Sequence, residues 1–291
     1  MGNFVHRLTK AAKAPLHALA RRAAKSYIAG SELDEALALA DRLAARGLRS
    51  TMGYWDAVGS EPSNVFAAYH EALEALGALG RDTYLSIKFP SLGYSTPILE
   101  SLVREAVRLQ VRLHFDAMGP ESVDRTWAAV DSALRQNADI GCTLPARWRR
   151  SPDDADWAAR RGLAVRVVKG QWPDPTDPRL DPRRGFEAII ERLAGRARTV
   201  AVASHDLGTA RAALERLSSL GTPATLELLY GLPLTRQIHL AHEFGVPARI
   251  YLPYGKAYLP YCLSQLKRNP RIAWWLVRDA MTARIGNAAA L

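Results

Sequence analysis

The sequence predicts an α/β fold, a (β/α)8 barrel of the TIM type, on three observations. Eight short β-rich runs alternate with longer segments of helical periodicity. Strands that are separated by crossover helices pair in parallel, and eight such units are the number that closes a barrel. No G-x-G-x-x-G follows any of the runs, which disfavours an open doubly wound sheet that binds dinucleotides through that motif.

The expected strands are short apolar runs, which is typical of strands buried in a parallel sheet. In chain order they occupy residues 48–54, 83–89, 111–116, 139–144, 164–169, 199–203, 224–228 and 248–252. The longer segments between them repeat apolar residues at helical spacing, as a helix with one buried face requires. The expected helices occupy residues 64–79, 96–109, 121–136, 186–194, 207–220 and 235–244.

Composition indicates a soluble and cytoplasmic protein. The chain is 48% hydrophobic, enough to bury a large core, yet it has no apolar run long enough to span a bilayer and no hydrophobic signal core. Its only cysteines, Cys142 and Cys262, form no C-x-x-C pair. We therefore expect core thiols, with neither a disulfide framework nor a metal site.

The formal net charge of +10 is concentrated at the N-terminus. Residues 1–31 hold six basic residues and no acidic ones, and apolar residues interleave with them at roughly helical spacing. This pattern predicts a basic helical segment over residues 1–30, ahead of a barrel over 31–291. The helix either lies solvated on the barrel or docks on a membrane surface. Elsewhere basic and acidic residues mix, and no nucleic-acid-binding motif is present, so no nucleic-acid partner is expected.

Polar residues gather where the expected strands end. In a barrel of this type the catalytic groups lie at the carboxyl ends of the strands. We therefore expect one site at one mouth of the barrel, formed by Lys88, Asp116, Lys169, Ser204-His205-Asp206, and Arg249 with Tyr251 and Tyr254.

The segment 165–172, VRVVKGQW, is the most informative of these. A buried strand that ends in a lysine and a glycine offers a fixed positive charge beside a backbone that an anionic cofactor can approach closely. Arg166 would project from this strand. The alternative is a structural ion pair for Arg166, with Lys169 merely ending the strand.

Taken in order, these motifs resemble the proline dehydrogenase family of flavoenzymes, whose members fold as a distorted (β/α)8 barrel that holds FAD. The resemblance runs over about residues 27–278. It is carried by SIK at 86–88, FDA at 115–117, VRVVKG at 165–170, SHD at 204–206, LLYGLP at 228–233 and RIYLPYG at 249–255. The ordered series is much more specific than any one motif.

The resemblance implies a role for each matching residue. The residues expected to hold the flavin and its phosphate chain are Arg166, Lys169, Gly170, Trp172, Ser204 and His205, with Trp172 standing where the family usually has tyrosine. The residues expected at the substrate are Lys88, Asp116, Tyr251 and Tyr261.

The activity implied by the resemblance is FAD-dependent oxidation of a C–N bond by hydride transfer to the flavin. The substrate would be an amine, an imine or an amino-acid derivative. The electrons would pass to a quinone or to oxygen, and the basic N-terminal segment would allow peripheral contact with a membrane.

Three departures from the family pattern bear on the substrate and the cofactor. Ser264 and Gln265 stand where the family has two arginines that clamp the substrate carboxylate. Two neutral side chains cannot reproduce that bidentate recognition, so proline itself is an unfavourable substrate. Pro145 stands near a flavin-contacting glutamine of the family, and Asp206 replaces its usual asparagine.

Two alternatives stay open. In the first, the protein oxidises proline with a displaced cationic clamp formed by Lys267 and Arg268, one helical turn further on. In the second, it is a flavin-binding or interaction barrel without turnover. Buried cations and a carboxylate are costly to keep without a task, which favours an enzyme.

Overall fold

The structure is a computed structural model that describes residues 29–57, 59–80, 82–136 and 138–255. The predicted basic segment lies almost wholly outside these ranges. So do Tyr261, Cys262, the substituted pair Ser264 and Gln265, and the alternative clamp of Lys267 and Arg268.

Eight parallel strands form a closed barrel in which each strand pairs with the next along the chain and β8 pairs with β1. This confirms the predicted barrel and the position of every expected strand. The strands are β1 (Arg49–Tyr54), β2 (Thr83–Ile87), β3 (Leu113–Phe115), β4 (Ile140–Pro145), β5 (Ala164–Val168), β6 (Thr199–Ala203), β7 (Ala224–Leu229) and β8 (Ala248–Tyr254).

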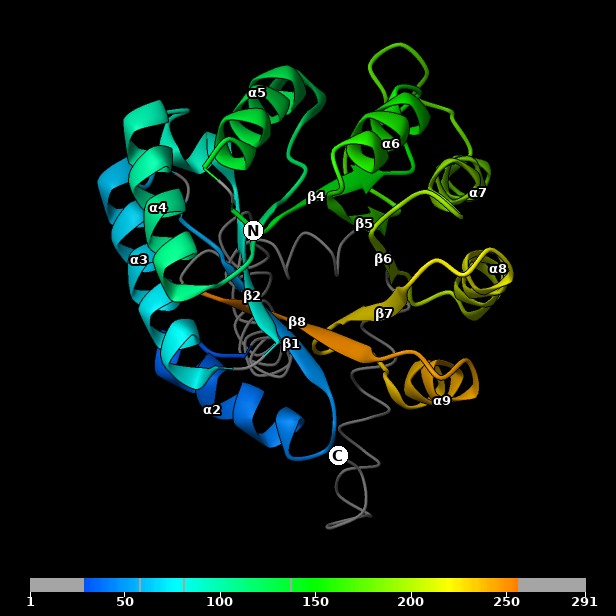
Figure 1. The fold of residues 1–291 in the computed structure, drawn as a ribbon, viewed down its shortest axis with the longest axis horizontal. Helices are drawn as coiled ribbons and strands as arrows, with labels where there is room; N and C mark the ends of the chain where they lie inside the picture. Colours follow the sequence, from blue (N-terminus) through cyan, green and yellow to red (C-terminus); the bar gives the residue numbers. More distant parts are fainter. Residues whose placement is uncertain (1–28, 58, 81, 137, 256–291) are drawn as a thin grey trace, which may run out of the picture.

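The helices form a layer around the outside of the barrel (Figure 1). They are α2 (Leu33–Ala44), α3 (Pro62–Leu79), α4 (Thr96–Leu109), α5 (Val123–Leu134), α6 (Ser151–Arg160), α7 (Pro182–Leu193), α8 (Leu207–Ser219) and α9 (Thr235–Glu243). Two short 3-10 helices, η1 (Phe89–Leu92) and η2 (Pro120–Ser122), follow β2 and β3. None of the helices in the described ranges combines the length and apolar content that crossing a bilayer requires.

Two helices differ from expectation. Sequence periodicity missed α6 because the helix buries Ser151, Asp154 and two alanines rather than a stripe of large apolar residues. Helix α7 begins four residues before the expected start. Its first turn is set by Asp181, whose side chain accepts a hydrogen bond from the Arg183 N–H, and by a proline at the first helical position.

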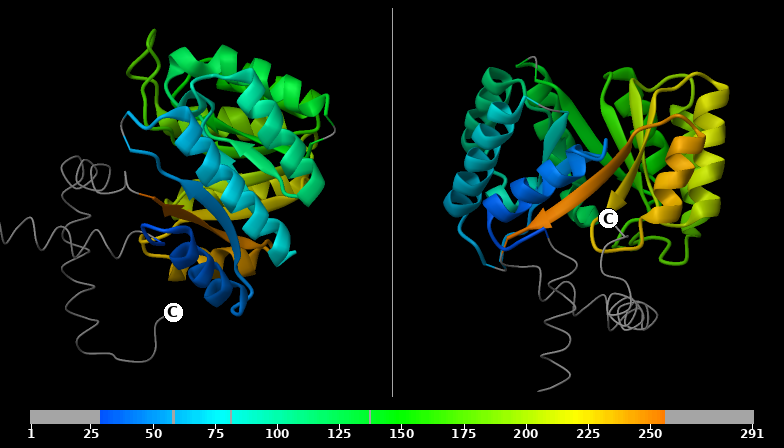
Figure 2. Two further views of the ribbon diagram at one scale, coloured as in Figure 1. Left: turned by 90° about the vertical axis from the view of Figure 1, so that its left-hand side faces the viewer. Right: turned by 90° about the horizontal axis from the view of Figure 1, so that it is seen from below.

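Helix α2 closes the outer layer between the last strand and the first. Each of the other seven helices follows a strand, whereas α2 precedes β1 and packs against both β1 and β8 (Figure 2). Just before α2 the chain is fixed to the end of β8, because the Ala29 N–H donates to the Pro253 carbonyl at 3.1 Å. Gly30 also forms an isolated parallel bridge with Tyr254.

Apolar side chains fill the space between the strands and the helices, whereas many of the buried polar side chains belong to the strands themselves. Cys142 belongs to the apolar core, as predicted, and burial raises the pKa of its thiol. The buried polar side chains on the strands include Thr51, Ser86, His114, Thr143, Arg166, Glu227 and Arg249. A polar barrel interior is costly unless its groups are paired, so their partners define the site.

Candidate active site

Asp116 joins three of the predicted site residues into one group. It follows β3, and its side chain accepts from Arg166 Nη1 at 2.6 Å and from the Tyr251 hydroxyl at 3.0 Å. Arg166 is on β5 and Tyr251 is on β8, so the contacts link strands that are far apart in the sequence. The strand-end argument therefore located residues that meet in space.

Arg166 lies between two carboxylates. Besides its bond to Asp116, its Nη2 pairs with Glu227 Oε1 at 3.0 Å. The side chain of Arg166 is 4% exposed and that of Glu227 is 1% exposed. The ion-pair alternative for Arg166 is thus what the structure contains, and direct contact with a flavin stays a prediction.

Glu227 is a site residue that the sequence analysis missed. Its carboxylate accepts from Thr51 Oγ1 at 3.0 Å and from the Tyr84 hydroxyl at 2.7 Å, in addition to pairing with Arg166. A single carboxylate inside an apolar strand, with leucines on either side in LEL, was the available signal.

Gly53 makes room for the Tyr251 ring. A Cβ added at Gly53 would lie 2.1 Å from the Tyr251 hydroxyl oxygen, so no larger residue fits there without moving the ring. Burial raises the pKa of Tyr251 well above its ordinary value, which keeps the phenol protonated and able to donate to Asp116. The orientation of Asp116 is consequently fixed from two sides.

Lys88 lies beside this group, directly after β2. Its ammonium donates to the Tyr54 carbonyl and lies 3.7 Å from the Asp56 carboxylate. The side chain is only 12% exposed, and burial lowers the pKa of its ammonium group. The neutral amine of Lys88 is therefore more accessible near neutral pH than that of an exposed lysine.

The segment after β5 presents a cation and a glycine, as predicted. Lys169 is exposed, and Gly170 has a φ of +86°. A Cβ at Gly170 would come within 2.8 Å of the Pro145 Cβ, so the close approach and the backbone angle both require glycine. Trp172, which is half-buried, accepts a hydrogen bond on its carbonyl from Trp148 Nε1 at 3.1 Å.

His205 follows β6 and contacts the end of β7. Its Nε2 accepts from the Leu229 N–H at 2.9 Å, which assigns the proton to Nδ1. Nδ1 is buried and its proton faces the Pro233 carbonyl. Its neighbours in the motif form a turn: Ser204 Oγ accepts from the Asp206 N–H, and Asp206 caps α8 through the Thr209 N–H.

The prediction that Arg249 faces the same mouth is wrong. Arg249 lies at the entry of β8, where it donates to the Ser50 carbonyl at 2.6 Å and to Asp82 Oδ1 at 2.6 Å. Asp82 precedes β2, so these contacts are at the opposite end of the barrel from Lys88 and Asp116. Arg249 thus links β8 to β1 and to the start of β2, and we assign it to closing the barrel.

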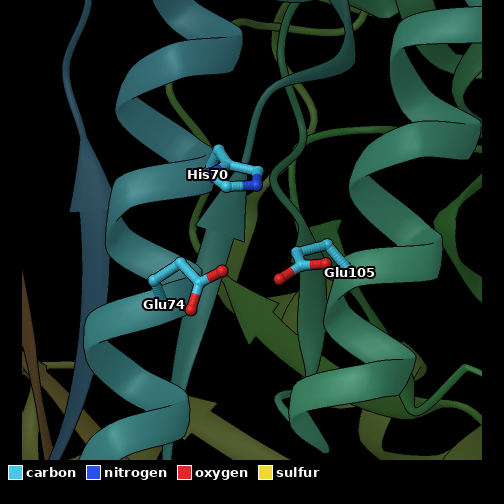
Figure 3. Close-up of side chains that lie close together, drawn as sticks. All are labelled: His70, Glu74 and Glu105. Carbon is cyan, nitrogen blue, oxygen red and sulfur yellow. The ribbon is translucent and has the colours of Figure 1, made fainter.

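A second group of ligand-type side chains lies on the outer helices. His70 and Glu74 on α3 approach Glu105 on α4, with ligand atoms within 4.8 Å of one another (Figure 3). Arg108 donates to both carboxylates, at 2.8 Å for Glu74, which already offsets their charge. We assign this group to helix packing.

Two buried neutral histidines make the fold sensitive to acid. Burial lowers the pKa of His114 well below its usual value and also lowers that of His205. His114 takes up a proton only on unfolding, so the free energy of unfolding should fall by up to about 1.4 kcal/mol per pH unit below roughly pH 6.5, and His205 should add a smaller contribution of the same sign. Urea denaturation from about pH 7 to about pH 5.5 measures this slope. His114→Gln should remove most of this slope, and a flat profile in the original protein would contradict the assignment.

Known proteins resemble this chain in sequence and in fold. No protein-family model matches the chain. It is 24% identical over 277 residues to proline dehydrogenase 1 of Bacillus subtilis subsp. natto, covering 90% of this chain and 91% of the relative. The chain is thus similar in sequence to proline dehydrogenases over most of its length. It is also 19% identical over 266 residues to proline dehydrogenase 2 of Bacillus subtilis strain 168, covering 86% and 88% of the two chains.

Solved structures share the fold. Proline utilization A from Bdellovibrio bacteriovorus, inactivated by N-propargylglycine, superposes with a TM-score of 0.70 at 18% identity, over 84% of this chain and 32% of that one. The protein of the same name from Corynebacterium freiburgense gives 0.69 at 20% identity, over 97% and 34%. The chain thus spans about a third of the length of those two proteins.

Proposed function

We propose that this chain is an FAD-dependent oxidoreductase of the proline dehydrogenase type, which oxidises a C–N bond of an amine, an imine or an amino-acid derivative. The observation that carries the proposal is the joined group of Asp116, Arg166 and Tyr251, with Lys88 beside it, in a chain that is similar to proline dehydrogenases. Cations and a carboxylate brought together at one end of a barrel are typical of a catalytic site.

The residues after β5 and β6 fit a flavin dinucleotide. Lys169 supplies an exposed positive charge and Gly170 a backbone open to close approach. His205 is held in place beside this loop, because its Nε2 accepts from the Leu229 N–H and its Nδ1–H faces the Pro233 carbonyl. These three residues, with Ser204 and Trp172, would hold the cofactor. The flavin, when bound, supplies the hydride acceptor.

The chain's own residues control the proton and the pose of the substrate. An amine donates hydride only when it is deprotonated, and Lys88 Nζ, whose pKa is lowered by burial, is suited to accept the proton of a substrate ammonium. Asp116 is held by Arg166 and Tyr251 and would orient that ammonium. The Tyr251 ring would form one wall of the pocket and exclude water.

The test is direct. The purified full-length protein should show the visible absorbance bands of bound flavin, and anaerobic addition of an oxidisable amine should bleach them. Absence of flavin binding would overturn the proposal. Bound flavin that no amine bleaches would favour the non-catalytic flavin-binding barrel instead.

We propose that the basic segment over residues 1–30 is an element separate from the barrel over 31–291. This segment bears on where the electrons go after the substrate is oxidised. A quinone or oxygen would accept the electrons, and a quinone would require peripheral contact with a membrane. Six cations without an acid favour anionic lipid.

Docking of this segment can be measured by sedimentation. Full-length protein should co-sediment with phosphatidylserine-containing vesicles at low salt, whereas protein that begins at Ser31 should stay in the supernatant. Vesicles of neutral phosphatidylcholine serve as the control, because attraction to them lacks the electrostatic contribution. Equal sedimentation of the two proteins would exclude the segment from membrane docking.

A further inference from the structure

Arg147 lies at the carboxyl end of β4, two residues after Pro145, on the loop that leads to α6. Backbone contacts hold this loop against β5, since the Ala146 N–H donates to the Val168 carbonyl at 2.7 Å. The Arg147 Cβ lies 3.7 Å from the position that a Cβ on Gly170 would take. Arg147 is thus a neighbour of the glycine assigned to the cofactor.

The guanidinium of Arg147 lacks a partner of its own. Its Nε is buried without a hydrogen bond. Over the described ranges, neither Arg147 nor Lys169 forms an ion pair or a side-chain hydrogen bond, whereas buried Arg166 and Arg249 both pair with carboxylates. Leaving a charged donor buried and unpaired costs free energy, which an anionic ligand would recover.

The position of Arg147 favours the cofactor over the substrate as the source of that anion. Arg147 follows β4 and Lys169 follows β5, which are adjacent strands (Figure 1), so both residues come from the segments next to Gly170. Tyr251 is on β8 and Lys88 follows β2, on other strands of the barrel. Two cations beside a glycine suit a diphosphate.

We propose that Arg147 binds the diphosphate of the flavin dinucleotide together with Lys169, an assignment that rests on the proposed function. Arg147 is not among the residues predicted from the sequence. Arginine matches phosphate oxygens with paired N–H donors, so its contribution is specific to the phosphate-bearing part of the cofactor.

Flavin titration of the full-length apoprotein tests the assignment. Quenching of flavin fluorescence gives the affinity for FAD and for riboflavin, which has the same ring system without phosphate. Arg147→Met should weaken FAD binding about 10- to 100-fold, as expected for one or two charged hydrogen bonds, and leave the riboflavin affinity unchanged. Arg147→Lys keeps the charge but lacks the paired N–H donors of arginine, so its affinity for FAD should lie between those of the original protein and of Arg147→Met.

The matched control is Arg149→Met, on the same loop. Its side chain is exposed and only its backbone N–H is engaged, by Asp174 at 2.8 Å, so FAD binding should be unchanged. Thermal melting of each variant shows whether it is folded. Unchanged FAD affinity in Arg147→Met would overturn the assignment, as would an equal loss for FAD and riboflavin. A rise in KM for carboxylate-bearing amines alone would also overturn it and would assign Arg147 to the substrate. If the original protein binds neither flavin, the proposed function itself fails.

Discussion

Replacement of Arg166 by methionine is expected to lower the free energy of unfolding by about 3–5 kcal/mol, because it leaves buried carboxylates without their counter-ion. Arg166 pairs with both Asp116 and Glu227, and the latter is 1% exposed. Thr51 and Tyr84 still donate to Glu227, but neutral donors do not offset a full buried charge. Urea denaturation at neutral pH measures the loss.

A second variant separates charge from packing. In the double variant Arg166→Met/Glu227→Gln the most deeply buried charge is gone together with its partner, so much of the lost stability should return. Glu227→Gln alone should cost less than Arg166→Met, since Arg166 keeps its bond to Asp116. If the double variant lost as much free energy of unfolding as the two single variants together, the unpaired carboxylate would not be the cause of the loss.

Free proline is expected to bind about three orders of magnitude more weakly than an otherwise similar substrate whose carboxylate is absent or modified. The reason is the pair Ser264 and Gln265, which stands where the resembling family has its two clamping arginines. Each missing charged hydrogen bond costs about 1.5–3 kcal/mol, and two of them correspond to roughly a thousandfold.

Stopped-flow reduction of the bound flavin distinguishes the substrates. Proline, proline methyl ester and pyrrolidine share the ring and differ in the carboxylate, so the concentration dependence of the rate isolates that group. Rapid reduction by millimolar proline would contradict the prediction and favour the displaced clamp. Lys267→Ala and Arg268→Ala would then be expected to weaken proline and to leave pyrrolidine unaffected.

The strands were predictable because periodicity and the β-rich character of each run are local properties. Ala164–Val168 and Thr199–Ala203 begin where the sequence indicates. Helix α6 was not predictable on that basis, because its buried face consists of small and polar residues that packing against β4 and α7 makes acceptable.

The candidate site was predictable in part. Lys88, Asp116 and Tyr251 follow from the rule that strand ends meet at one mouth. The rule failed for Arg249, which is near the beginning of its strand, and it could not reveal Glu227, which is in the middle of one. Partners of a buried charge come from distant strands, and only the closed barrel shows which carboxylate Arg166 meets.

The place of α2 in the outer layer bears on how the chain folds during synthesis. The first helix of the described barrel and the last strand are neighbours, so the ribosome releases one side of this seam, α2 and β1, long before the other side, β8. Until β8 emerges, one edge of β1 lacks its partner strand and α2 lacks half of its packing surface. An unpaired strand edge can pair with a strand of another chain as well as with its own partner. We therefore expect folding to compete with aggregation until this seam closes.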